Sequence, residues 1–134
     1  MVRGRPEPDP AYVARVATYA LALPEVHEED AWTGVRWRIR QRTVAHVLMT
    51  TPDRATEYGV DLAAPAPLLT FRASGEELLA LSLSGPPYVK PRWSPTVVGL
   101  LLGEDTDWDE VGELVTESYR LLAPQRLVRL LQDR

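Results

Sequence analysis

Residues 35–42 read Val-Arg-Trp-Arg-Ile-Arg-Gln-Arg, with an arginine at every second position. Side chains at alternate positions of a β-strand lie on the same face of the sheet. The pattern therefore predicts a strand that exposes its arginines and directs Trp37 and Ile39 into a core. The four residues of this arginine ribbon are Arg36, Arg38, Arg40 and Arg42. We expect the ribbon to be a binding feature rather than a catalytic one.

The segments on both sides of the ribbon predict further strands. Residues 26–32 and the ribbon from 35 to 40 read as a hairpin around Thr33-Gly34, and residues 43–49 supply a third strand. Before them, Asp9-Pro10 is typical of a helix start, and apolar residues follow at helical spacing up to Pro24. Residues 50–67 contain three prolines and no sustained periodicity, which indicates an ordered surface loop.

The second half of the chain alternates strand and helix signals. Residues 68–72 form a compact strand, Ser74 with Glu77 reads as a capping box for a short helix, and residues 96–102 form a buried strand. Asp107 opens a long helix that ends before Pro124, and residues 127–131 add an amphipathic turn. We infer an α+β fold: a two-layer sandwich in which an antiparallel sheet of about five strands has helices packed on one face.

Composition limits the class of protein. The 134 residues fit a single domain, residues 1–134, in which residues 1–9 are expected to form a flexible tail. Cysteine is absent, which excludes disulfides and thiolate metal sites. No apolar run is long enough for a membrane span, so we expect a cytoplasmic protein with no membrane partner. The formal net charge of −4 argues against indiscriminate attraction to nucleic acid.

Catalytic patterns are weak, and we expect no enzyme, no cofactor and no metal. The two histidines, His27 and His46, lie on separate predicted strands and have no partner at metal-ligand spacing. The serines lack a nucleophile-elbow context, and the glycines form no phosphate-binding loop. The acidic residues from Glu104 to Glu110 are accounted for by a favourable interaction with a helix N-terminus.

Several short motifs, in order, resemble the MmcQ/YjbR family over roughly residues 11–130. The motifs are Leu23-Pro24-Glu25-Val26, Glu28-Glu29, Trp32, Trp37-Arg38-Ile39-Arg40, Pro87-Tyr88-Val89, Thr106-Asp107-Trp108-Asp109-Glu110 and Ser118-Tyr119-Arg120-Leu121. The resemblance implies a bacterial α+β protein, similar in fold to secretion chaperones and frataxin-like proteins, with a DNA-binding role that is assigned by inference.

The resemblance can also be followed at individual positions. Arg42 and Arg72 stand where the family commonly has lysine, and Trp37 stands where it commonly has phenylalanine. Departures are Gln41 in place of a turn glycine, Val97 in place of a tryptophan and Leu101 in place of a basic residue. The basic face is therefore retained on the hairpin, whereas the last strand has lost a charge and an aromatic ring.

Two functions follow from these patterns. The first is a nucleic-acid-binding module that would bind DNA through phosphate contacts, because guanidinium groups neutralise phosphates. Its candidate residues are the arginine ribbon together with Arg72, Lys90, Arg92 and Trp93. The second is a protein-interaction or chaperone-like module that uses the open sheet face or residues 126–131. A simpler alternative stays open for the ribbon: acidic residues of strand 26–32, such as Glu29 opposite Arg38, can neutralise it internally.

Overall fold

The computed structural model describes residues 6–132, and this part of the chain contains six strands and four α-helices. The strands are β1 (His27–Asp30), β2 (Val35–Ile39), β3 (Arg42–Thr50), β4 (Ala66–Arg72), β5 (Tyr88–Val89) and β6 (Val97–Leu101). The helices are α1 (Pro10–Ala20), α2 (Gly75–Leu83), α3 (Trp108–Leu122) and α4 (Gln125–Gln132), with a 3-10 turn, η1, at Ala55–Tyr58. All strand pairs are antiparallel, in the order β1-β2-β3-β4-β6-β5.

This arrangement confirms the predicted α+β fold, with one short strand that the sequence did not reveal. The additional strand is β5, whose two residues follow Pro86-Pro87 and pair with the edge of β6. Two helix starts form as expected: Asp9 Oδ1 accepts from the Ala11 amide at 2.8 Å, and Asp107 Oδ1 accepts from the Asp109 amide at 3.1 Å. The capping box predicted at Ser74 is wrong, because its side chain makes no capping hydrogen bond.

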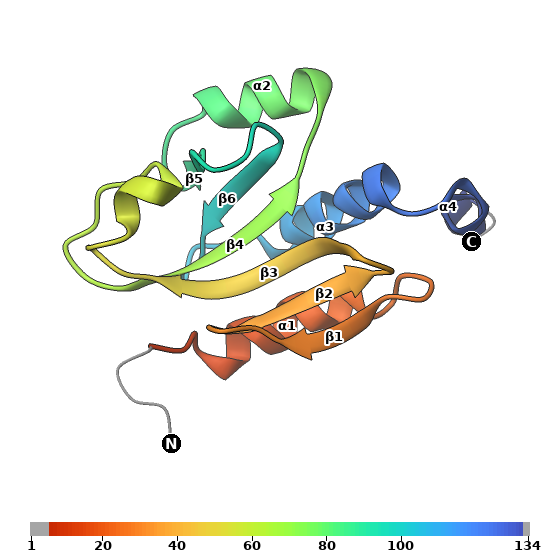
Figure 1. The fold of residues 1–134 in the computed structure, drawn as a ribbon, viewed down its shortest axis with the longest axis horizontal. Coiled ribbons are helices and arrows are strands. Elements are labelled where there is room, and N and C mark those ends of the chain that lie inside the picture. Colours follow the sequence, from red (N-terminus) through yellow and green to blue (C-terminus); the bar gives the residue numbers. More distant parts are fainter. Residues whose placement is uncertain (1–5, 133–134) are drawn as a thin grey trace.

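One face of the sheet is covered by α1 and α3, which pack against each other behind the strands (Figure 1). Trp37 and Ile39 of β2 point into this layer and are almost fully buried, as predicted from the alternation. Tyr119 is fully buried as well, and its hydroxyl donates to the Pro24 carbonyl oxygen at 2.8 Å. The helix layer therefore fixes which side of β2 faces the core.

Ser118 ties α3 to the two central strands. Its buried hydroxyl donates to the Val44 carbonyl oxygen at 2.7 Å and accepts from the Arg72 amide at 3.0 Å. The β2–β3 register shifts between Trp37 and Arg38, so the backbone near Val44 is irregular. Ser118 supplies hydrogen-bond partners that the strands do not supply to each other at this point.

The opposite face of the sheet is covered over only part of its area. The excursion between β3 and β4 folds back here and places Tyr58 on an apolar cluster with Leu48, Leu68 and Val89. The remaining area of this side, which we call the open face, is polar. By strand register its polar residues are His27 and Glu29 of β1, Arg36 and Arg38 of β2, Thr43 and His46 of β3, and Thr70 and Arg72 of β4.

The turn between β1 and β2 is held by contacts from both sides. Gly34 adopts φ +70°, and a Cβ at this position would lie 1.7 Å from the Val47 carbonyl oxygen. The Gly34 amide donates to Glu7 at 2.8 Å, and the Thr33 hydroxyl donates to the Pro6 carbonyl oxygen at 3.0 Å. The predicted tail, residues 1–9, thus lies partly outside the described residues, while residues 6 and 7 contact this turn.

The terminal helix α4 packs on the main core. Leu127 is 1% exposed and belongs to the same cluster as the residues beneath α3. The amphipathic segment 126–131, considered in the sequence as a surface for another protein, therefore directs much of its apolar face inward. None of the helices in residues 6–132 combines the length and apolar character needed to cross a bilayer.

Replacing Ser118 by alanine is expected to destabilise the fold by about 1–3 kcal/mol, because the Val44 carbonyl and the Arg72 amide would both lose a buried partner. Urea unfolding of the variant measures the change. Thr18→Ala is the control, since the Thr18 hydroxyl is exposed and bonds only within α1; we expect it to change stability by less than about 0.5 kcal/mol. Equal stability of the two variants would contradict the bridging role.

The fold is expected to lose stability as the pH falls below about 6.5 because of His46. Burial lowers the pKa of His46 below its ordinary value of 6.5, although its Nε2–H donates to the Thr33 carbonyl oxygen at 2.9 Å, and nearby Arg36 lowers it further. The unfolded chain then binds a proton at a pH where the folded chain does not, so protonation favours unfolding. Urea unfolding between pH 8 and pH 5.5 should show the decline.

His46→Gln should reduce this pH dependence, since glutamine does not titrate and its amide can still donate to Thr33. His27→Gln, which removes the other histidine of the chain, should leave the contribution of His46 in place. An unchanged slope in His46→Gln would show that other groups cause the decline.

Candidate nucleic-acid interface

The structure divides the arginine ribbon between a strand, a turn and the next strand. β2 ends at Ile39, Arg40 adopts φ +57° in the turn, and Arg42 is the first residue of β3. Arg42 pairs with Ile39, whose side chain faces the helices, whereas Arg38 pairs with Thr43 on the open face. The expectation that all four arginines share one face is therefore wrong: by register only Arg36 and Arg38 do, because the two-residue turn reverses the chain.

The two arginines that leave the ribbon have different surroundings. Arg40 Nη2 lies 3.2 Å from Glu25 Oε1, and the second oxygen of Glu25 lies 3.6 Å from Arg126 of α4. Arg42 is exposed and forms no ion pair within residues 6–132. Arg40 is thus part of a surface contact near α4, and Arg42 lies outside the open face.

Arg36 and Arg38 share a single carboxylate, that of Glu29 on β1. Arg36 Nε donates to Glu29 Oε1 at 2.5 Å, and Arg38 Nη1 donates to the same oxygen at 3.4 Å. Arg38 also donates to the Gln41 carbonyl oxygen, and its Nε is buried without a partner among the described residues. The cross-strand pairing of Glu29 with Arg38 is therefore present, but one carboxylate serves two guanidiniums and leaves a net positive charge.

The chemistry of Glu29 agrees with this contact. Partial desolvation opposes ionisation of Glu29, but the hydrogen bonds and charges of Arg36 and Arg38 outweigh it and hold its pKa below the ordinary value. Glu29 is thus an anion at neutral pH. It contacts both arginines from the neighbouring strand β1.

Arg72 lies on the open face without a carboxylate partner. Its Nη1 donates to the Thr96 hydroxyl at 2.6 Å, and no ion pair to it occurs within the described residues. The contact holds one of the five N–H donors of the guanidinium and leaves the others available. Arg72 is therefore a cation that is positioned but not neutralised.

Lys90, also predicted as a binding residue, has an internal role in the structure. Its Nζ donates to the carbonyl oxygens of Pro91, at 3.0 Å, and Ser94. Desolvation by burial lowers its pKa below the ordinary value. Lys90 thus holds the loop of residues 90–96 in shape.

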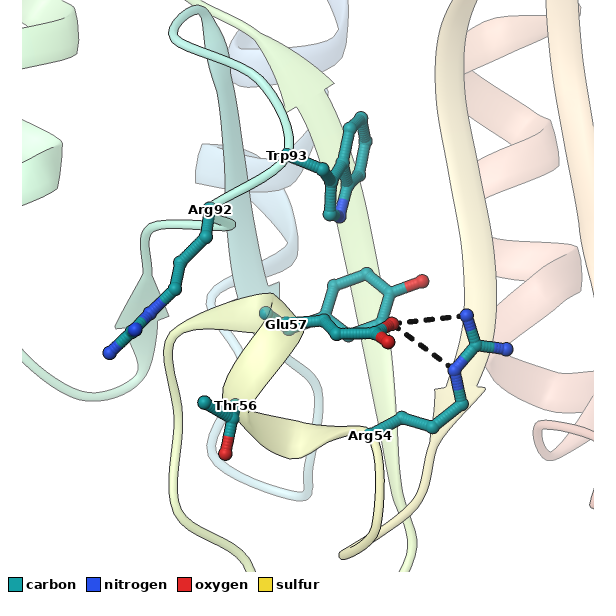
Figure 2. Close-up of a pocket in the computed structure, with 6 residues that line it drawn as sticks. Arg54, Thr56, Glu57, Arg92 and Trp93 are labelled. Atoms are coloured by element: carbon teal, nitrogen blue, oxygen red, sulfur yellow. Dashed lines mark hydrogen bonds and ion pairs between the residues drawn. The ribbon is translucent and has the colours of Figure 1, made fainter.

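Trp93 is presented at the surface by this loop. Its side chain is 55% exposed and meets the Tyr58 ring edge to face, with 6.2 Å between ring centroids. The Arg92 amide donates to the Glu57 carbonyl oxygen at 2.9 Å, which fixes the loop on η1. The Arg92 guanidinium extends away from Trp93, whereas Arg54 and Glu57 form an ion pair at 3.0 Å beside the pocket (Figure 2).

Two cavities share Trp93 in their linings. The smaller, about 200 Å³, lies on the open face and is lined by Arg36, Thr43, His46, Thr70, Phe71, Arg72, Trp93 and Val97. The larger, about 560 Å³, is lined by Arg54, Thr56, Glu57, Tyr58, Arg92 and Trp93. Trp93 is the residue that lines both. The structure therefore brings four of the sequence-predicted residues, Arg36, Arg72, Arg92 and Trp93, around one pair of cavities.

Sequence reasoning missed the residues that complete the smaller cavity. The missed residues His46 and Thr70 are direct neighbours of the predicted Arg36 across β2, β3 and β4. Their positions follow from the pairing register, which a one-residue difference in a turn reverses. The alternation within each strand was visible in the sequence, but the alignment of one strand with the next was not.

The described residues offer no site for a metal ion. Within residues 6–132 no three side chains of histidine, cysteine, aspartate or glutamate converge. His27 lies 3.7 Å from Glu29, but Glu29 is already bound by the two arginines. Arg36, Arg38 and Arg72 give the open face hydrogen-bond donors and positive charge, which suit an anion.

Comparison with known proteins places the chain in a family. A crystal structure of a protein from Pseudomonas syringae, determined by the Northeast Structural Genomics Consortium, superposes with a TM-score of 0.62 and 13% sequence identity, over 90% of this chain and 98% of that chain. At this identity the likeness shows the fold alone. No curated protein matched the sequence. The model of the YjbR family matches residues 21–121, which is most of the chain. The protein therefore belongs to the YjbR family.

Proposed function

We propose that this protein binds nucleic acid on its open face, without enzymatic activity, and that a single strand of DNA is the preferred form. The observation that supports the proposal most directly is the surplus of guanidinium groups on the open face and on the adjoining loop that carries Arg92 and Trp93. Arg36 and Arg38 share one carboxylate, and Arg72 and Arg92 have none within the described residues. This part of the surface keeps a positive charge after its internal ion pairs are formed.

The shape of the surface favours a single strand over a duplex. Trp93 is exposed beside basic side chains, which is the combination that single-strand binders use for base stacking and phosphate neutralisation. The cationic side chains lie on a sheet and a short loop, so the chain presents no helix here for insertion into a major groove. Recognition of this kind depends on the phosphate backbone and tolerates different base sequences.

The second candidate is a protein-interaction module that uses the same face and binds no nucleic acid. It is supported by the same positive charge, because an acidic protein surface also supplies oxygen anions for guanidinium groups. In that case no nucleic-acid base would be present to stack on Trp93. Oligonucleotide binding that requires both charge and Trp93 favours the first candidate, and absence of oligonucleotide binding at low salt favours the second.

A fluorescently labelled single strand of DNA should bind with a salt-dependent affinity that Arg72→Gln/Arg92→Gln weakens. At about three phosphate contacts, the slope of log affinity against log salt is expected near −2, and loss of two contacts should reduce it by about 1.4. We expect the double variant to bind roughly 30-fold more weakly at low salt, because it loses two charged hydrogen bonds that together contribute about 2 kcal/mol. Fluorescence anisotropy at several salt concentrations measures both quantities.

The matched control is Arg42→Gln/Arg129→Gln, which removes the same charge from exposed arginines that lie neither on the open face nor on the loop of Arg92 and Trp93. It should keep the wild-type slope. If the two double variants lose affinity equally, net charge rather than the open face governs binding, and the proposed site is wrong.

Glu29→Gln should strengthen binding of the same DNA by about two- to fivefold, which corresponds to the contribution of an exposed ion pair. The physical reason is competition: Glu29 occupies Arg36 and Arg38, so its neutralisation frees both for phosphate. Anisotropy at fixed low salt measures the gain.

Glu113→Gln is the control for Glu29→Gln, because it makes the same charge change on the exposed surface of α3. A gain confined to Glu29→Gln supports the open face as the binding surface. Weaker binding by Glu29→Gln would mean that Glu29 positions the arginines for their ligand rather than competing with it.

A further inference from the structure

The two cavities that share Trp93 differ in chemistry in a way that matches the two ends of one ligand. The smaller cavity has two guanidiniums, an imidazole and two threonine side chains in its lining, and no acidic residue among the described residues that line it. The larger cavity has the aromatic rings of Tyr58 and Trp93 in its lining, together with the Arg54–Glu57 ion pair, Thr56 and Arg92. One part suits a compact anion, and the adjoining part suits a flat ring.

The size of the smaller cavity restricts its ligand. Its volume of about 200 Å³ lies below the 300–1,000 Å³ typical of sites for whole drug-sized ligands. It therefore suits a group such as phosphate rather than a whole nucleotide. Because Trp93 lines both cavities, a ligand that fills the smaller one and extends past the Trp93 side chain would reach the larger one.

The polar side chains of the smaller cavity come from several directions. Its donors include Arg36, Thr70 and Arg72. The Nε2–H of His46 already donates to the Thr33 carbonyl oxygen, so His46 contributes shape and polarity to the lining rather than a free N–H. Arg36, His46 and Thr70 stand side by side on three adjacent strands, and Arg72 lies two residues further along β4. Arg36 donates to Glu29 and Arg72 donates to Thr96, contacts that leave further N–H groups on each guanidinium. A tetrahedral anion with several free oxygens can use donors arranged in this way more fully than a planar carboxylate can.

We propose that this paired site binds a terminal nucleotide: a phosphate monoester lies in the cavity of Arg36, His46 and Arg72, and the attached base stacks on Trp93 in the larger cavity. The proposal deepens the proposed function and rests on the same face. A terminal phosphate monoester carries more charge and more free oxygens than the diester of an internal nucleotide. The site therefore distinguishes an end from the rest of a strand, and a free mononucleotide offers the same chemistry.

The experiment compares matched ligands by calorimetry and competition anisotropy. The small probes are adenosine 5′-monophosphate, adenosine and inorganic phosphate, and the strand probes are one short DNA oligonucleotide with a 5′-phosphate and the same oligonucleotide with a 5′-hydroxyl. We expect the monophosphate to bind roughly 10- to 100-fold more tightly than adenosine, since it gains charged hydrogen bonds. The oligonucleotide with the 5′-phosphate should likewise bind more tightly than the same oligonucleotide with a 5′-hydroxyl.

Two variants separate the two halves of the site. Arg72→Gln should abolish most of the preference for monophosphate over adenosine, whereas Arg42→Gln should leave it unchanged. Trp93→Leu should weaken the binding of both ligands by the same factor and keep the ratio of their affinities, because it removes only stacking. Where Arg72→Gln does not retain the wild-type unfolding midpoint, the comparison of monophosphate with adenosine on the unmodified protein decides the matter.

The outcomes distinguish this proposal from the proposed function. Phosphate-dependent binding of both the mononucleotide and the oligonucleotide supports a site for strand ends. Phosphate-dependent binding of the mononucleotide alone, with no oligonucleotide binding, supports the paired site with a free nucleotide as ligand and overturns the nucleic-acid function. Equal binding of monophosphate and adenosine overturns the paired site. Equal binding within both pairs of ligands, the two small ligands and the two oligonucleotides, overturns it as well, even where DNA binds elsewhere on the open face.

Discussion

The register of β2 between β1 and β3 is the constraint on which the rest of the structure depends. It places Trp37 and Ile39 against the helices, and so it places Arg36 and Arg38 on the open face. A slip by one residue would bury the guanidiniums and expose the tryptophan. Gly34 helps to fix this register, because its positive φ and its closeness to the Val47 carbonyl leave no room for a side chain in the turn.

The sequence allowed the elements of the fold to be predicted with few errors, because the signals for them are local. Alternation identified β2, the Asp9 and Asp107 caps identified helix starts, and Pro124 separated the last two helices. β5 was missed because two residues carry no periodicity. The capping box predicted at Ser74 was wrong because a capping box requires a particular side-chain geometry, whereas the sequence pattern supplies only the residue types.

The candidate site could be predicted only in part, because it depends on contacts between segments. Arg72, Arg92 and Trp93 were identified by residue type and local setting, and the structure brings them to the same pair of cavities. The separation of Arg42 from the open face depends on where the β2–β3 turn begins. The sharing of Glu29 by two arginines depends on register alone. Neither was available from composition or spacing.

The sheet also explains how an acidic chain can keep a cationic surface. The carboxylates of Asp109, Glu113 and Glu117 follow one another on α3, in the helix layer, while the uncompensated guanidiniums lie on the other side of the strands. The packed core between the two layers keeps these groups from forming ion pairs with each other. Charges on one surface interact over about 8–10 Å at ordinary ionic strength, so the two sides act on a ligand separately.

This separation has a consequence for how an anion would approach the protein. The net charge of −4 repels a polyanion at a distance, while the open face attracts it nearby. Such a molecule favours ligands that reach the open face with a small, strongly charged group rather than ligands that lie along the whole surface. Glu29 increases this selectivity, because a ligand must displace a carboxylate that is already bound to Arg36 and Arg38. A doubly charged phosphate end competes for those two arginines more effectively than a singly charged diester, and the site that we propose beside Trp93 depends on this difference.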